Sequence, residues 1–222
     1  MALDENTVYA LAAVAIFLVV GFPVHEFAHA FAAHRLGDNT AKLFGRLTLN
    51  PLVHLDPIGA IVLVLSAFVG GGRLFIGWAK PTPVNPAMLR GGRRSDAIVA
   101  AAGPVSNLLM AAAAAIVLRI LVAVVDVPSE PIAFAFNVLL YFVYINVALF
   151  IFNLVPIPPL DGSHVLFAFM DPRTVWKVRP VLDQWGLMVL LFVMIVPIGG
   201  LSLGARVIGP LMDGIATLLV GF

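Results

Sequence analysis

The five residues His25-Glu26-Phe27-Ala28-His29 combine side-chain types that can bind a metal ion and activate water. On a helix, residues four positions apart lie about 40° apart around the axis, so both imidazoles can reach one ion. Glu26 then stands beside them as a carboxylate able to deprotonate a metal-bound water. This is the HExxH spacing of zinc sites, and it predicts His25 and His29 as metal ligands.

The surroundings of the motif strengthen this interpretation. It lies in an otherwise apolar stretch, residues 8–33, where ionisable side chains are costly at membrane depth and usually functional. The alternative is that the three side chains pair with one another or with backbone carbonyls and only stabilise helix packing. That alternative is disfavoured, because apolar replacements would serve packing at a lower cost.

Composition indicates an integral membrane protein. Hydrophobic residues make up 61% of the 222 residues, charged residues 11%, and the mean hydropathy is +1.05. A net charge of +1 leaves no basic surface of the kind that binds nucleic acid. The chain has no cysteine, so a metal must be held by histidine and carboxylate ligands. We expect no cleaved signal peptide, because Asp4 and Glu5 stand where a basic segment would be required.

The distribution of apolar segments predicts a single domain over residues 1–222, an all-α polytopic membrane protein. We expect about six transmembrane or re-entrant helices. Two of them are marginal, so the number of spans is five or six. The expected segments are 7–35, 58–69, 95–125, 132–154, 184–196 and 208–220, with a short apolar helix ending near residue 170 and a basic connector at 171–179.

A small membrane-associated β-structure is expected between the first two helices and the third. Residues 43–49 and 73–84 are rich in β-prone residues and end at breakers such as Asn50-Pro51.

Charges in the connecting segments predict the orientation. Acidic residues precede the first segment and basic residues follow it, and the sign stays consistent at later crossings. By the positive-inside rule, His25, His29 and Asp161 therefore lie toward the cytoplasmic side. We expect an integral protein of a prokaryotic cell membrane.

A catalytic zinc site usually needs a third protein ligand. Asp161 is the best candidate, because it follows a proline-broken apolar segment at the same expected depth. The alternative role for Asp161 is to cap the helix that begins near residue 163. Other candidates are His54 and Asp56, which can equally be turn residues or neighbours of the site, and His164, which is expected to support or pack. His34 is expected to be interfacial.

Two sequence elements in combination resemble the site-2 protease family of intramembrane zinc metalloproteases. His25–His29 matches the family's HExxH, and residues 153–162 (NLVPIPPLDG) match its NxxPxxPLDG. Supporting matches are residues 103–107 (GPVSN), 50–59 (NPLVHLDPIG) and 77–86 (GWAKPTPVNP). The resemblance covers most of the chain from His25 to Gly162.

The resemblance implies that His25, His29 and Asp161 bind one zinc ion and that Glu26 is the general base. It also implies a place for Asn153 near the reacting carbonyl, and for Asn107 beside a ligand or the substrate. Both asparagines could instead form interhelical hydrogen bonds. The expected substrates are transmembrane segments of other membrane proteins, received by strand pairing with the extended pieces.

The resemblance further implies a minimal member of the family. No insertion of PDZ size and no nucleotide-sensing domain can be fitted to the sequence, so we expect a catalytic core at about 7–170 with additional C-terminal spans at about 171–222. One alternative function is a membrane metal-ion transporter or metal-binding membrane protein that uses the same His/Asp site and does not need Glu26. Another is a scaffold that binds membrane proteins without cutting them.

Overall fold

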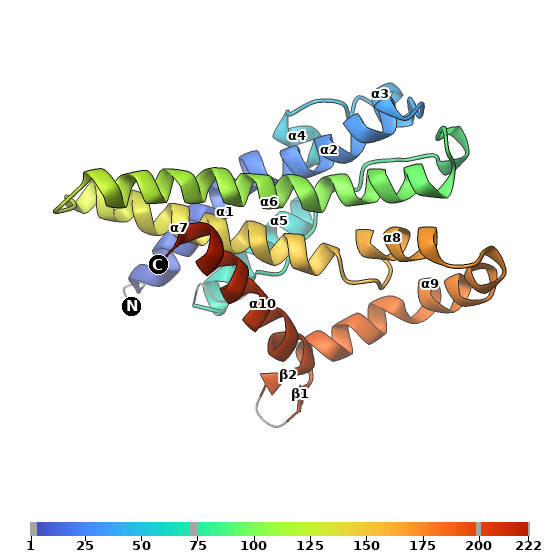
Figure 1. The fold of residues 1–222 in the computed structure, drawn as a ribbon. Coiled ribbons are helices and arrows are strands. Elements are labelled where there is room, and N and C mark those ends of the chain that lie inside the picture. The colour runs from blue at the N-terminus through green and yellow to red at the C-terminus, as the bar shows by residue number, and fades with distance from the viewer. Residues whose placement is uncertain (1–3, 72–74, 199–200, 222) are drawn as a thin grey trace.

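The structure, a computed structural model, describes residues 4–71, 75–198 and 201–221. The protein is mostly helical, as expected (Figure 1). The helices are α1 (Glu5–Ile16), α2 (Phe22–Arg35), α3 (Thr40–Leu43), α4 (Pro51–His54), α5 (Pro57–Val69), α6 (Arg93–Val124), α7 (Glu130–Asn153), α8 (Asp161–Phe169), α9 (Pro172–Ile195) and α10 (Leu203–Val220), with a π-helical turn η1 (Phe17–Gly21) and a 3-10 turn η2 (Pro86–Met88).

Among the described residues, four helical segments are long and apolar enough to cross a membrane. They are Glu5–Arg35, Arg93–Val124, Glu130–Asn153 and Leu203–Val220. These four confirm the expected segments 7–35, 95–125, 132–154 and 208–220. The expected segment 58–69 is also helical, but α5 has only 13 residues and is shorter than an ordinary span.

The first span runs through α1, η1 and α2 without a break in the helical backbone. The π-helical turn precedes Pro23, which has no N–H for the usual helical hydrogen bond. The N–H of Phe22 instead bonds to the carbonyl of Phe17, five residues back. The Phe17 ring lies over Gly21, where a Cβ would come within 2.0 Å of it. Glycine is therefore required at this point, one turn before His25.

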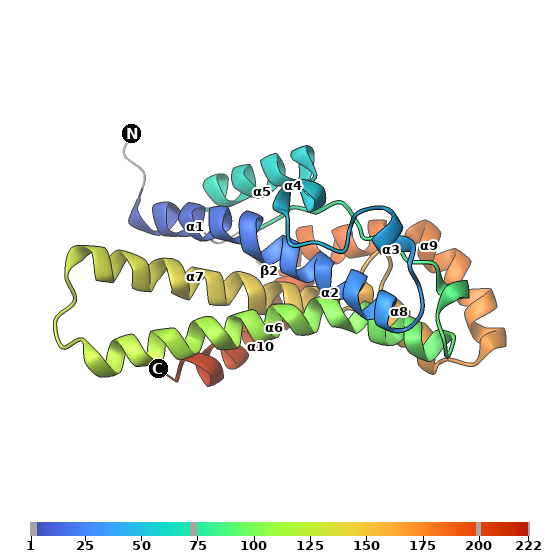
Figure 2. The same cartoon turned by 90° about the horizontal axis from the view of Figure 1, so that it is seen from above.

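The antiparallel pair α6 and α7 forms the centre of the molecule (Figure 1). Helix α1 packs on α7 and α2 packs on α6, as the view from above shows (Figure 2). The buried face of α6 includes the small residues Ala111, Ala114 and Ala115, which allow helices to approach closely. Phe17 of η1 and Val143 of α7 belong to the same apolar core.

The expected β-structure between the early helices is not found in the described part of that region. Residues 40–43 are helical, and the extended stretch 75–85 forms a single antiparallel bridge, between Leu55 and Ala79. Its prolines have no N–H for a ladder. Its other hydrogen bonds go instead to helices and loops, as in that between the N–H of Ile76 and Oγ of Ser66, 2.8 Å. Part of the predicted strand, residues 73 and 74, lies outside the described residues.

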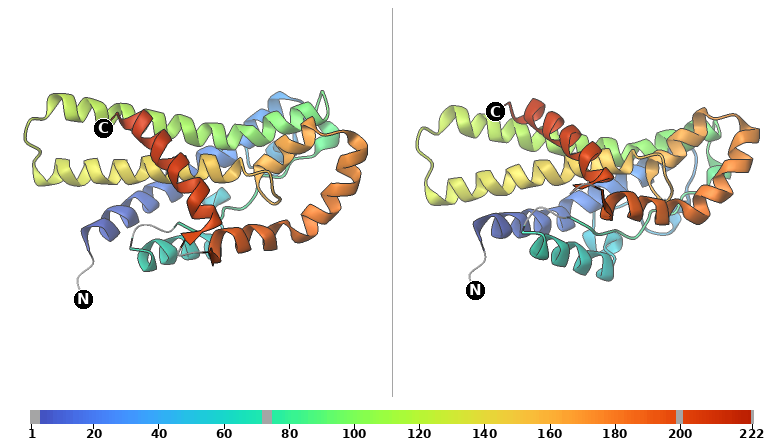
Figure 3. Two further views of the ribbon diagram at one scale, coloured as in Figure 1. Left: turned by 60° about the horizontal axis from the view of Figure 1, so that its bottom comes forward. Right: turned by 90° about the horizontal axis from the view of Figure 1, so that it is seen from below.

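The prediction of a connector at 171–179 is wrong, because residues 172–195 form one helix, α9. The side chain of Asp171 caps it by accepting a hydrogen bond from the N–H of Arg173, 2.8 Å. The expected segment 184–196 is thus the second half of a longer helix. A short antiparallel pair, β1 (Pro197–Ile198) and β2 (Leu201–Ser202), connects α9 to α10, which returns across α6 and α7 (Figure 3).

Candidate metal centre

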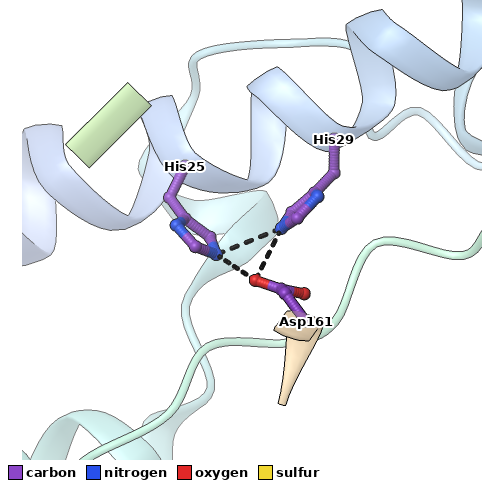
Figure 4. Close-up of side chains that lie close together, drawn as sticks. All are labelled: His25, His29 and Asp161. Carbon is purple, nitrogen blue, oxygen red and sulfur yellow. Dashed lines mark hydrogen bonds and ion pairs between the residues drawn. The ribbon is translucent and has the colours of Figure 1, made fainter. Parts of the chain in front are cut away.

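Three potential ligand atoms from two separate helices meet at one point (Figure 4). His25 and His29 lie one turn apart on α2, and Asp161 is the first residue of α8. The two Nε2 atoms are 3.1 Å apart. Oδ2 of Asp161 lies 3.6 Å from Nε2 of His25 and 3.4 Å from Nε2 of His29. The structure therefore brings together the three residues that the sequence predicted as ligands.

The other ring nitrogen of each histidine is bound to α6. Nδ1 of His29 lies 2.7 Å from the carbonyl oxygen of Val99, and Nδ1 of His25 lies 2.9 Å from Oδ1 of Asn107. Both partners are oxygens that accept hydrogen bonds, so each Nδ1 carries the proton. The lone pairs of the two Nε2 atoms then face each other and Asp161, which is the orientation that metal-binding histidines adopt.

This donor set fits a zinc ion. Oδ2 of Asp161 is buried and forms no hydrogen bond with any part of the chain that the structure describes. Two lone pairs and a carboxylate oxygen in contact repel one another unless a cation or proton lies between them. Zinc bonds of 2.0 to 2.2 Å in tetrahedral geometry imply ligand separations of roughly 3.3 to 3.6 Å, close to those observed. Three ligands also leave a fourth position for water or substrate.

Helix α6 approaches the two imidazoles closely because residue 103 is glycine. A Cβ at Gly103 would lie 2.2 Å from Nε2 of His29 and 2.7 Å from Cε1 of His25. Asn107, one turn further along α6, then reaches His25. The two ends of the GPVSN sequence thus contribute a close approach and a hydrogen-bond acceptor.

Glu26 and the two imidazoles line a cavity of about 480 Å³. Asn107, Asn153 and Asp161 also line it, so the cavity has both polar and apolar walls. Glu26 is buried, and its Oε2 accepts hydrogen bonds from the backbone N–H and the hydroxyl of Thr82, at 2.8 and 2.7 Å. The cavity can therefore place water or a peptide bond beside a carboxylate and the three ligand atoms.

The other predicted residues lie in different surroundings. His54 is fully buried at the end of α4, and its Nε2 donates a hydrogen bond to the carbonyl of Thr48, 2.7 Å, in the segment that precedes this helix. Asp56 caps α5 by accepting from the N–H groups of Ile58 and Gly59. His34 bonds to Asn39, close to the end of α2.

Sequence reasoning did not single out Thr82 or Asp96. Asp96 forms an ion pair of 2.9 Å with His164, and both line the cavity. Thr82 lies in the GWAKPTPVNP match and is the one hydroxyl residue there, which could have marked it as a polar residue near the site. Its contact with Glu26 joins residues 56 positions apart, so no local pattern indicates it.

Comparisons with known proteins agree with the geometry. The model of peptidase family M50 matches residues 120–197, which include Asn153 and Asp161. A Bacillus subtilis protein named "Putative zinc metalloprotease YwhC" is 39% identical over 189 residues, covering 83% of this chain and 80% of that protein. "Putative zinc metalloprotease Rip2" of Mycolicibacterium smegmatis is 31% identical, covering 86% of this chain and 72% of that protein.

The protein named Rip2 of Mycobacterium tuberculosis is 30% identical, with 88% of this chain and 73% of that protein covered. No solved structure matches the chain. Each of these relatives covers more than four fifths of this chain, and apolar helices long enough to cross a membrane accompany the site. The chain therefore belongs to peptidase family M50, the site-2 protease family of intramembrane zinc metalloproteases.

Proposed function

We propose that His25, His29 and Asp161 hold a single zinc ion and that Glu26 acts as general base. With these groups the protein hydrolyses peptide bonds in or near transmembrane segments of other membrane proteins. The observation that carries this proposal is the meeting of two imidazole lone pairs and an unbonded carboxylate oxygen beside a buried glutamate. Family membership favours hydrolysis over the transporter alternative.

The residues that line the cavity have separate roles in the proposed hydrolysis. A bound zinc ion supplies Lewis-acid polarisation of the peptide carbonyl and of a water molecule. Glu26 accepts the proton of the attacking water and returns it to the leaving amine. Asn153, at the end of α7, contributes a hydrogen-bond donor on the cavity wall for the carbonyl oxygen. Asn107 keeps His25 in the tautomer that presents Nε2.

The extended stretch 75–85 is proposed to receive the substrate. Gly77, Trp78 and Thr82 of this stretch line the cavity next to the three ligand atoms. A substrate helix must unwind before its peptide bonds become accessible, and an extended partner satisfies the backbone groups that unwinding frees.

The catalytic core comprises about residues 7–170 in this proposal, and residues 171–222 are additional. The site faces the cytoplasmic side of a prokaryotic membrane. The basic residues that follow α2 and precede α6 support this orientation, and the relatives named above are bacterial.

Cleavage of transmembrane peptides by the purified protein in detergent tests the proposal. We expect the wild type to cut at least one peptide in a panel and Glu26→Gln to be slower by about 100-fold or more, because proton transfer is lost. Glu26→Gln should still bind one zinc per chain, measured by metal analysis, whereas His29→Ala should not. Chelation should stop cleavage, and added zinc should restore it.

Equal cleavage by the wild type, Glu26→Gln and the chelated protein would refute the proposal. Zinc uptake into proteoliposomes without cleavage of any peptide would favour the transporter alternative instead.

A further inference from the structure

Thr82 donates two hydrogen bonds to the side chain of Glu26. Its backbone N–H and its hydroxyl both donate to Oε2, at 2.8 and 2.7 Å. The hydroxyl also lies 3.1 Å from the Glu26 backbone carbonyl oxygen. Two donors thus converge on a single carboxylate oxygen, which leaves the other oxygen, Oε1, available for a different partner.

The chain around Thr82 permits little movement. Pro81 and Pro83 flank it, and because proline fixes φ and has no N–H, Thr82 carries the one backbone donor of the three residues. On one side, the stretch packs against α5 so closely that a Cβ at Gly59 would lie 2.1 Å from the carbonyl oxygen of Trp78. On that side also, the N–H of Lys80 donates to the carbonyl of His54, 2.8 Å.

On the other side of Thr82, the backbone N–H of Asn85 donates to the fully buried Asp38, 2.7 Å. Burial raises the pKa of this carboxyl, but hydrogen bonds from Thr40 and Asn85 outweigh that effect and lower it below its ordinary value. Asp38 is therefore an ionised anchor at neutral pH. The stretch is tied down on both sides of the residue that contacts Glu26.

We propose that Thr82 is a positioning residue that fixes the rotamer of Glu26, so that Oε1 faces the attacking water. This inference rests on the proposed role of Glu26 as general base. The hydroxyl of Thr82 keeps the carboxylate from rotating toward other donors. The same contact joins Glu26 to the extended stretch 75–85, which lines the cavity. The position of the general base relative to a substrate bound along this stretch is therefore fixed.

Substitutions at Thr82 test the positioning role. Thr82→Val keeps the shape and the backbone N–H but removes the hydroxyl, whereas Thr82→Ser keeps the hydroxyl. A carboxylate displaced by about 1 Å can slow a reaction up to 100-fold. We expect Thr82→Val to lower kcat about 10- to 100-fold with KM within about twofold of the wild-type value. Thr82→Ser should restore kcat to within about threefold of wild type.

The matched control is Thr217→Val, which makes the same replacement on the exposed face of α10. We expect it to behave like the wild type. Zinc content should be the same in all four proteins, because Thr82 bonds to Glu26 and to no metal ligand. The midpoint of thermal unfolding should fall by only about 2 to 4 °C in Thr82→Val, because one hydrogen bond of about 1 kcal/mol is lost. In the Glu26→Gln background, Thr82→Val should cause no further loss of rate.

The outcomes separate this inference from the function on which it rests. Wild-type cleavage by Glu26→Gln would refute the role of Glu26 itself. An inactive Glu26→Gln together with a wild-type kcat in Thr82→Val would overturn the positioning role alone. Equal losses in Thr82→Val and Thr82→Ser, or a loss of zinc that parallels the loss of kcat, would likewise overturn it and leave Thr82 a structural residue.

Discussion

The two ring nitrogens of each histidine in the candidate metal centre lie in different surroundings. The Nδ1 atoms bond to α6, through a backbone carbonyl in one case and an amide side chain in the other. Neutral imidazole has one donor and one acceptor nitrogen, so these contacts decide which nitrogen is free. α6 thereby prepares both Nε2 atoms for a cation, although it contributes no ligand itself. The zinc affinity of the site is therefore expected to depend on how closely α6 approaches α2.

Gly103→Ala tests that dependence. Its new Cβ would meet Nε2 of His29 at 2.2 Å, so either the imidazole or α6 must move. We expect zinc affinity to fall at least 10-fold and cleavage to be lost, measured by chelator competition and peptide hydrolysis. Alanine is the better helix former by about 1 kcal/mol, so weaker helix propensity cannot cause such a loss.

Gly209→Ala on α10 is the matched control, because a Cβ there has nothing within 4 Å. It should bind zinc and cut peptides as the wild type does. Wild-type zinc affinity in Gly103→Ala would contradict the close approach of α6 to the imidazoles.

At the scale of elements, the short helix α8 depends on α6 for its position. Nine residues are too few to form a stable helix alone. Arg93, at the start of α6, donates from Nη1 to the carbonyls of Phe167 and Met170, at 3.3 and 2.9 Å, where α8 ends. Asp96, also on α6, pairs with His164 in the middle of α8. These contacts hold the helix whose first residue is Asp161.

Arg93→Met should therefore weaken metal binding without touching a ligand. It removes a guanidinium from carbonyls at a helix C-terminus, a contact that contributes about 1 kcal/mol when partly exposed. We expect a lower thermal midpoint and a zinc affinity reduced several-fold, measured by chelator competition. Arg94→Met, at the exposed neighbouring position, should change neither quantity. Equal behaviour of the two variants would disprove the anchoring of α8 by Arg93.

The elements that the sequence predicts well are those set by local patterns. Long apolar runs bounded by charges and prolines predict α6 and α7 to within a few residues, and the spacing of His25 and His29 places both on one helix face. The stretch 75–85 was predicted as strand because its residues favour extension, but its prolines prevent a ladder and helices supply its partners. The continuation of α9 through 172–179 was missed because the basic residues of this segment suggest a connector between helices. Pro172 occupies the first turn of α9, where proline is tolerated.

Contacts between residues far apart in the sequence could not be predicted from local patterns. The link from Thr82 to Glu26 and that from Arg93 to α8 depend on how helices pack, which no local spacing encodes. Asp161 could be predicted as a candidate from its place after a proline-broken segment, but its distance to the imidazoles could not.

Over the whole molecule, the charges separate between the two ends of the bundle. The end formed by α3, α8 and the start of α6 carries Lys42, Arg93 and Arg94, and the loop from α6 to α7 at the opposite end carries Asp126 (Figures 1 and 3). Basic ends stay in the cytoplasm when membrane proteins insert. The candidate metal centre contacts Val99 and Asn107 in the first half of α6, so it lies in the part of the bundle nearer the basic end.

Single cysteines can test this orientation, because the chain has none of its own. Lys42→Cys places a thiol at the exposed basic end, and Val127→Cys places one in the loop from α6 to α7, where Val127 is 86% exposed. In intact cells a membrane-impermeant maleimide should label Val127→Cys and spare Lys42→Cys. Inverted vesicles should give the reverse, and both variants should cleave peptides as the wild type does, which verifies their fold. Labelling of Lys42→Cys in intact cells would place the zinc site toward the outside, and substrates would then have to reach it from the opposite face of the membrane.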